Sequence, residues 1–346
     1  MAGKKSKPLK AGVIGLGRAG WNIHVSRMRN DARFQITAVS DLEAARCEEA
    51  REEFGCETFS DWKQLLKNAD CELVVVASQS VDHGPHTIAA LKSGRHVVVE
   101  KPMALSVSEA TRMIKASETA GKKLFVHQNF RYHPDIRHIQ EIIKSKVLGR
   151  VFEIRIRQFS FARRNDWQTL QKFGGGNLNN TCPHFIDAAL LLLDSPVKTL
   201  FTDLQLTTDV GDADDHAKII LKGENGRVID LEISTSCAWG EPKWTLLGTN
   251  GTLRSDGETS EIKYFDPKKL KPLKVNEAPP SARQYGSGEV LPWQEETRPS
   301  VADVPSDFYD NVFAVIRKDI KMDISPESVR EVIRVIETAH RQNAPL

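Results

Sequence analysis

The tripeptide Glu100-Lys101-Pro102 directly follows three valines, and two of its residue types can move protons. Consecutive β-branched residues without polar interruption predict a strand buried on both faces of a parallel sheet. Pro102 cannot donate to a strand ladder, so the strand ends there and leaves an acid and an amine at its carboxyl end. Open α/β sheets bind ligands at this edge. Lys101 is therefore predicted to carry protons; the alternative is that both charges only solvate a strand end.

A second polar stretch lies where glycine-rich sequence enters an apolar helix. The glycines at 174–176 allow the backbone to run close to a ligand. Asn180 and His184 are four residues apart, so they share one face if the helix has begun by Asn180. The following residues 185–193 are strongly apolar, which predicts a buried helix with polar groups at its entrance. Alternatively, Asn180 only caps this helix and His184 is a core histidine.

Gly15, Gly17 and Gly20 form a GxGxxG spacing between a short apolar strand and a helix. This arrangement is typical of a dinucleotide-binding turn, in which the backbone approaches a diphosphate. A second predicted strand, Phe34–Ser40, ends at Asp41, about 20 residues past the turn. A carboxylate there accepts hydrogen bonds from ribose hydroxyls and repels the extra phosphate of NADP, so NAD is the expected cofactor. The alternative is that Asp41 caps the next helix.

The elements around these motifs predict an α/β chain with two domains. Alternating strands and helices over residues 10–127 indicate an NAD-binding Rossmann domain with a doubly wound parallel sheet. Strict alternation from Val151, with Phe152, Ile154 and Ile156 inward, together with Asn-Gly turns indicates a large, mostly antiparallel, open-faced sheet. We assign residues 128–346 to an α+β substrate and oligomerisation domain, and residues 1–9 to a disordered basic lead-in. Proline-rich residues 267–305 are predicted to form an extended arm that wraps a neighbour in a homodimer or homotetramer.

Composition restricts the possible partners. The 346 residues carry 48 Lys and Arg against 46 Asp and Glu, a net charge of +2, which argues against nucleic-acid or membrane-surface binding by bulk charge. No apolar run is long enough to span a bilayer. The five cysteines contain no CxxC pair, so we expect no disulfide framework, no zinc site and a reducing cytoplasm. His83 and His86 lack further ligands nearby, so no metal is predicted.

Taken in order, GVIGLGRAG, Asp41, SQSVDHGPH, EKP and GGGNLNNTCPH resemble the Gfo/Idh/MocA family, the relatives of glucose-fructose oxidoreductase and inositol dehydrogenase. The likeness covers nearly the whole chain, and EKP followed by the glycine run and a histidine is its most specific part. The resemblance implies that Lys101 and His184 are catalytic, with Asn180 beside them, and that Glu100 lies by the nicotinamide ribose. His83 matches the family's strand-end histidine, whereas Ser78-Gln79-Ser80 replaces the usual Thr-Pro-Asn.

The candidate residues fall into two further groups. Those expected to bind the cofactor are Gly15, Leu16, Gly17, Arg18, Ala19, Asp41, Ser78, Gln79, His83, Glu100, Lys101 and Gln128. Those expected to contact substrate are Arg131, Arg163, Arg164, Asp166 and Trp167, although surface arginines are commonly only solvated.

Two positions depart from the family pattern. Many relatives carry aspartate where this chain has Asn180 and glycine where it has Cys182. Asparagine can orient a histidine without carrying charge, which leaves Lys101 the larger share of proton transfer. We expect NAD-dependent oxidation of a secondary ring alcohol on a sugar, sugar derivative or cyclitol. The alternatives are glycoside hydrolysis through transient oxidation and elimination, and a nucleotide-binding regulator without turnover.

Overall fold

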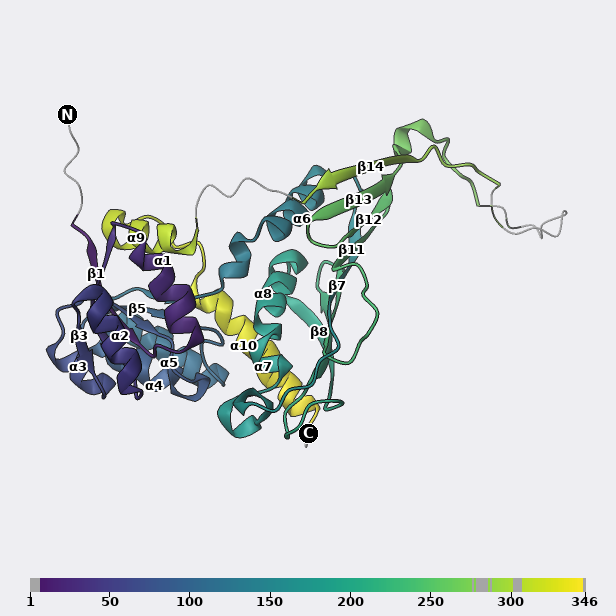
Figure 1. Cartoon of the computed structure of the whole chain (residues 1–346). Coiled ribbons are helices and arrows are strands. Elements are labelled where there is room, and N and C mark those ends of the chain that lie inside the picture. The colour runs from purple at the N-terminus through teal and green to yellow at the C-terminus, as the bar shows by residue number, and fades with distance from the viewer. Residues whose placement is uncertain (1–6, 276, 278–285, 287, 301–306, 345–346) are drawn as a thin grey trace, which may run out of the picture.

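The computed structural model describes residues 7–275, 277, 286, 288–300 and 307–344. The structure contains two sheets, one toward each end of the molecule, and helices lie between them (Figure 1). The first is a parallel sheet covered by helices, and the second is mostly antiparallel. The predicted fold class, a Rossmann domain followed by an α+β domain, is confirmed. None of the described helices is both long and apolar enough to cross a membrane.

The first sheet has the strand order β3-β2-β1-β4-β5-β6, and its strands are parallel. The order reverses between β1 and β4, which is where doubly wound sheets bind nucleotides. Its strands are β1 (Leu9–Ile14), β2 (Phe34–Ser40), β3 (Glu57–Phe59), β4 (Leu73–Val76), β5 (His96–Val99) and β6 (Leu124–Val126). The connecting helices are the π-helical turn η1 (Gly20–Val25), α1 (Ser26–Arg29), α2 (Ala44–Phe54), α3 (Trp62–Asn68), α4 (His83–Lys92) and α5 (Val107–Ala120).

The second sheet has the order β14-β13-β12-β11-β7-β10-β9-β8. Its neighbouring strands run antiparallel, apart from the parallel pair β7 and β10. Its strands are β7 (Val151–Phe159), β8 (Val197–Gln205), β9 (His216–Gly223), β10 (Val228–Ser234), β11 (Trp244–Gly248), β12 (Gly251–Ser255), β13 (Thr259–Tyr264) and β14 (Gln294–Pro299). Helices α6 (Pro134–Ser145), α7 (Asn177–Asn180) and α8 (Cys182–Leu193) lie on one face, and the other face is open (Figure 1).

One inward residue was predicted wrongly. Ile154 and Ile156 are buried as expected, but Phe152 is 36% exposed. The pairing of β7 with β11 shifts register between Leu247 and Gly248, so a bulge interrupts the alternation at Phe152. Val151 is consequently buried in its place.

The proline-rich segment contains a strand that the sequence did not reveal. Residues 294–299 form β14, which pairs antiparallel with β13 at the sheet edge. Other parts of the predicted arm (276, 278–285, 287 and 301–305) and residues 1–6 of the predicted lead-in lie outside the described residues. Leu9, which we placed in the lead-in, already belongs to β1 and is fully buried.

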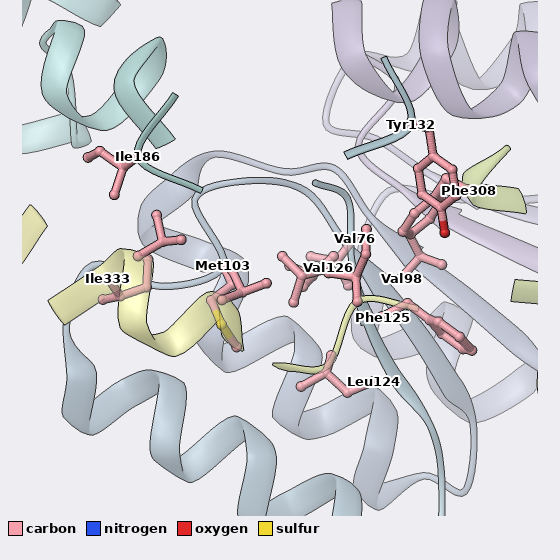
Figure 2. Close-up of a cluster of buried hydrophobic side chains, with 14 of the residues drawn as sticks. Val76, Val98, Met103, Leu124, Phe125, Val126, Tyr132, Ile186, Phe308 and Ile333 are labelled. Atoms are coloured by element: carbon pink, nitrogen blue, oxygen red, sulfur yellow. The ribbon is translucent and has the colours of Figure 1, made fainter. Parts of the chain in front are cut away.

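The last two helices return to the first domain. Helix α9 (Phe308–Lys318) lies beside α1, and α10 (Pro326–Gln342) packs against both α5 and α8 (Figure 1). Figure 2 shows the buried cluster that results, with Met103 and Val126 of the first domain near Ile333 of α10 and Phe308 of α9. The core is therefore continuous between the two domains.

Candidate active site

The glycine turn after β1 has two glycines that packing requires and one that faces open space. Gly15 has φ of +91°, and a Cβ there would lie 2.5 Å from the carbonyl oxygen of Ala77. A Cβ at Gly20 would overlap the carbonyl oxygen of Gly15. At Gly17, by contrast, a Cβ would meet none of the described atoms within 4 Å. The turn is thus held tight at both ends and leaves its middle open to a diphosphate.

Asp41 lies against this turn. Its Oδ2 accepts a hydrogen bond from the backbone N–H of Leu16 at 2.6 Å. Its Oδ1 accepts from the backbone N–H of Glu43 at 2.9 Å and lies 3.3 Å from the guanidinium of Arg46. The N-cap of α2 is Glu43 rather than Asp41. The carboxylate is therefore placed beside the turn as a ribose ligand requires, with a cation next to it that the sequence analysis did not consider.

The loops after β4 and β5 are joined by His83. This buried ring has Nδ1 at 2.7 Å from the carbonyl oxygen of Pro102 and Nε2 at 3.1 Å from that of Ser78. The hydroxyl of Ser78 also lies 3.0 Å from Nδ1 of His86, while Gln79 is exposed at the rim. His83 and His86 thus brace the strand-end loops that carry Ser78 and Lys101.

Lys101 reaches from the first domain to the second. Its Nζ donates a hydrogen bond to the backbone carbonyl oxygen of Asn180 at 2.7 Å. Burial lowers the pKa of this amine, Glu100 raises it and Arg18 lowers it, and the net shift is downward from the ordinary lysine value. A lowered pKa makes the neutral amine, which can accept a proton, more abundant near working pH.

His184 of the second domain lies near enough to Lys101 for the two side chains to interact electrostatically. Its ring stacks on Phe130 with centroids 4.2 Å apart and an interplanar angle of 17°. Burial, followed by the charge of Lys101, lowers the pKa of His184 to about 3. Its Nδ1 is buried and has no hydrogen-bond partner in the described part of the chain. A neutral ring of this kind is a weak base but can still make a hydrogen bond to a ligand, so Lys101 is the stronger candidate base.

Asn180 and His184 lie on different helices, so the condition under which they would share one helix face is not met. Helix α7 ends at Asn180, and Thr181 is the N-cap of α8, which also rules out Asn180 as the cap of that helix. Pro183 has no N–H to continue the helical hydrogen bonds across this junction. The Asn180 amide instead exchanges two hydrogen bonds with the amide of Gln168, at 3.3 and 3.2 Å.

Glu100 is surrounded by protein donors. Its Oε1 lies 2.7 Å from Nδ1 of His127 and 2.9 Å from Nε2 of His24, and its Oε2 accepts from the backbone N–H of Lys101 at 3.0 Å. His24, Glu100 and His127 form the one group of potential metal ligands found among the described residues. The distances from the two ring nitrogens to the carboxylate oxygen are those of direct hydrogen bonds. The sequence analysis missed both histidines and Gln168, although His127 directly follows β6 at the same sheet edge.

The predicted substrate residues divide into two sets. Arg164 pairs with Asp166 at 2.8 Å and also bonds to Gln168, so this segment is linked to Asn180. Arg163 and Trp167 of the same segment are exposed.

Arg131 lies elsewhere. Its guanidinium donates two hydrogen bonds to Asp187, at 2.7 and 2.5 Å, and one to Ser328 at 3.0 Å. It also lines a surface depression with Tyr132, Arg137 and Asp323, away from Lys101. Arg131 therefore links Asp187 and Ser328 within the second domain, and its predicted contact with substrate stays a prediction.

The residues present fit NAD. The open middle of the glycine turn suits a diphosphate, and Asp41 beside it suits a ribose. Gln128 is buried next to the site: its Nε2 donates to the carbonyl oxygen of Pro183 at 3.3 Å, and its Oε1 has no partner in the described structure. This orphaned oxygen can accept a hydrogen bond from a carboxamide, the group that nicotinamide carries.

Comparison with known proteins agrees with this geometry. Residues 9–128 match the oxidoreductase family with an NAD-binding Rossmann fold, and residues 136–254 match the GFO/IDH/MocA C-terminal domain. The chain therefore belongs to the GFO/IDH/MocA oxidoreductase family.

Similar proteins cover most of the chain. An uncharacterised oxidoreductase of Schizosaccharomyces pombe is 26% identical over 365 residues, 97% of each chain. The myo-inositol 2-dehydrogenase of Thermotoga maritima is 27% identical over 255 residues, 72% of this chain and 75% of its own. The crystal structure of an NAD-binding protein from Listeria innocua superposes with a TM-score of 0.82 at 25% identity and covers 98% of this chain and 96% of its own.

Proposed function

We propose that this protein is an NAD-dependent dehydrogenase that oxidises a secondary ring alcohol of a sugar, sugar derivative or cyclitol, or reduces the matching ketone. One observation carries the proposal: the Lys101 amine extends from the Rossmann domain to the carbonyl of Asn180, close to His184 of the second domain. An amine and an imidazole from separate domains can thus meet at one substrate oxygen. The inositol dehydrogenases among the relatives support a polyhydroxylated ring as substrate.

The chain's own residues account for proton transfer and orientation. When bound, NAD supplies the acceptor for the hydride that leaves the alcohol carbon. The neutral amine of Lys101 accepts the hydroxyl proton, and in the reverse direction its ammonium donates a proton to the ketone oxygen. His184 stays neutral and makes a hydrogen bond to the same oxygen, while the carbonyl of Asn180 fixes the direction of the lysine side chain.

The test is NADH formation, followed at its absorbance band, with a panel of sugars and cyclitols. Lys101→Ala should lower kcat by about 100-fold or more on the best substrate, because the base is lost. The matched control is Lys115→Ala, an exposed lysine on α5, which should keep the full rate. A Lys101→Ala enzyme as fast as this control would refute the proposed role. Release of free sugar without net NADH would indicate hydrolysis through transient oxidation.

We further propose NAD in preference to NADP, because Asp41 lies where an extra ribose phosphate would be repelled. All five cysteines are free thiols, which supports a reducing cytoplasmic location. The open face of the second sheet suits either solvent or a second subunit of the proposed homodimer or homotetramer, and sedimentation measurements test for the assembly.

A further inference from the structure

A buried polar network connects the candidate base to the far end of the chain. It consists of His24 in η1, Glu100 after β5, His127 after β6 and Tyr309 in α9, and all four side chains are buried. His24 Nε2 lies 2.9 Å from Glu100 Oε1, and His24 Nδ1 lies 2.7 Å from the hydroxyl of Tyr309. Neither the two histidines nor the tyrosine has a part in the proton-transfer mechanism proposed above.

The donors in this network can be assigned from chemistry. A carboxylate only accepts, so His24 Nε2 and His127 Nδ1 both donate to Glu100 Oε1. Burial is the main cause that lowers the pKa of His24, so its ring is neutral at working pH. The Nδ1 of a neutral ring that already donates through Nε2 is an acceptor, and the Tyr309 O–H donates to it. Tyr309 therefore fixes the tautomer and the plane of His24.

The same carboxylate supports Lys101. Burial alone would raise the pKa of Glu100, but His127 and His24 outweigh it, so this carboxyl stays ionised. Its Oε2 accepts the backbone N–H of Lys101 at 3.0 Å. Its charge favours the Lys101 ammonium, against burial and against Arg18 of the glycine turn. Other titratable groups that face these residues include His83 of α4 and His184 of α8, whose pKa values burial lowers, and Arg27 and Asp307 beside Tyr309.

We propose that His24, His127 and Tyr309 are positioning residues that hold the Glu100 carboxylate, and through it Lys101, in the geometry for proton transfer. The inference rests on the proposed dehydrogenase function. It gives helix α9 a part in the active site although α9 lies outside both family-matched segments.

Helix α9 is attached firmly enough for this role. Asp307, its N-cap, pairs with Arg27 at 2.6 Å and with the backbone of Asp310 in a capping box. Tyr309 itself packs edge-on against Phe34, with ring centroids 5.4 Å apart. The helix that brings this hydroxyl to His24 is therefore anchored at its N-cap and at the Tyr309 ring.

The direction of each effect follows from electrostatics. The ring N–H groups point their positive ends at Glu100 and offset part of its charge. Loss of the Tyr309 hydroxyl loosens His24, so the negative charge is less compensated and the pKa of Lys101 rises. Glu100→Gln removes the charge altogether, so the pKa of Lys101 falls, by about one unit or more.

The test compares Tyr309→Phe with Tyr132→Phe in the full-length enzyme. Each change removes one tyrosine hydroxyl that makes a hydrogen bond, and the Tyr132 hydroxyl donates to Asp323 at 2.9 Å rather than to His24. Tyr309→Phe should lower kcat about tenfold at unchanged KM and shift the pH profile upward by about half a unit. Tyr132→Phe should change neither. Equal kcat and equal pH profiles for the two variants would overturn the proposal.

His127 provides a second arm in case Tyr309→Phe folds poorly. His127→Leu removes a donor to Glu100 and should behave like Tyr309→Phe, whereas His127→Asn keeps an N–H near the position of Nδ1 and should restore most of the rate. If Asn and Leu at this position gave the same kcat and pH profile, the positioning role would be wrong.

One readout does not depend on turnover. The pH dependence of Lys101 reductive methylation by formaldehyde with cyanoborohydride as the reductant, followed by mass spectrometry in the enzyme without substrate, reports changes in the pKa of the amine. It should move upward in Tyr309→Phe and downward in Glu100→Gln. If these shifts are found but no alcohol is oxidised, the proposed function fails while the network stands; if turnover is found without the shifts, the network proposal fails alone.

Discussion

The substitution Gly17→Ala tests whether this glycine is needed to bind a ligand rather than to maintain the fold. A Cβ at residue 17 meets none of the described atoms within 4 Å, so the protein without ligand should accommodate it. Loss of glycine's freedom in the unfolded chain should even stabilise the protein, by about 0.4 to 1 kcal/mol. The new methyl group nevertheless projects into the space that a diphosphate needs. NAD affinity should therefore fall at least about tenfold, or 1.4 kcal/mol.

Gly20→Ala is the matched control. Its Cβ would overlap the carbonyl oxygen of Gly15, a backbone atom that cannot move aside cheaply. Overpacking of this kind should cost about 1 to 3 kcal/mol of unfolding free energy. Thermal unfolding and isothermal titration with NAD measure the two quantities. If Gly17→Ala bound NAD as tightly as the unchanged protein, or if it were destabilised as much as Gly20→Ala, the open turn would not be the diphosphate site.

Three further predictions concern the cofactor, the base and the fold. Asp41→Ala should raise the ratio of kcat/KM with NADP to kcat/KM with NAD about tenfold or more, because the repelling carboxylate is lost and Arg46 no longer pairs with it. Adding Arg46→Ala to this variant should reverse the gain. An unchanged ratio in Asp41→Ala would contradict the role of Asp41. The amine of Lys101 is protonated and inactive in acid, so kcat/KM for oxidation should rise with pH. Because the pKa of Lys101 is lowered, this rise should level off below the ordinary lysine value of 10.5. A profile that rises only above that value would argue against Lys101 as the base. Arg131→Met should lower the free energy of unfolding in denaturant by about 3 to 5 kcal/mol, because it leaves buried Asp187 unpaired. The KM for substrate should change little in the folded enzyme. A raised KM at full stability would instead indicate that Arg131 contacts substrate.

Local patterns were enough to predict the fold class and the elements around the site. The strand β2 has the bounds that the apolar run and the flanking Asp41 indicate, and the Ser106 hydroxyl caps α5 by accepting from the backbone N–H of Glu109. Each of these features depends on neighbours in the sequence. The position of Lys101 just after β5 was predictable for the same reason, because a valine run followed by proline indicates where a strand ends.

The missed features depend on contacts between distant segments. His24 and Tyr309 are 285 positions apart, and nothing near either residue indicates the other. The exposure of Phe152 follows from a register shift against β11, which belongs to another hairpin. Asn180 pairs with Gln168 because the two chain segments fold toward each other, so the helix spacing from Asn180 to His184 was misleading.

The return of α9 and α10 to the first domain means that the nucleotide-binding part is not a separable module. A fragment ending near residue 128 would bare Phe34, whose ring packs against Tyr309 and Phe313, and the face of α5 that α10 covers. Such a fragment should be insoluble or bind detergents and other apolar surfaces. An exchange of Rossmann domains between relatives would have to bring the final helices along with the first 128 residues.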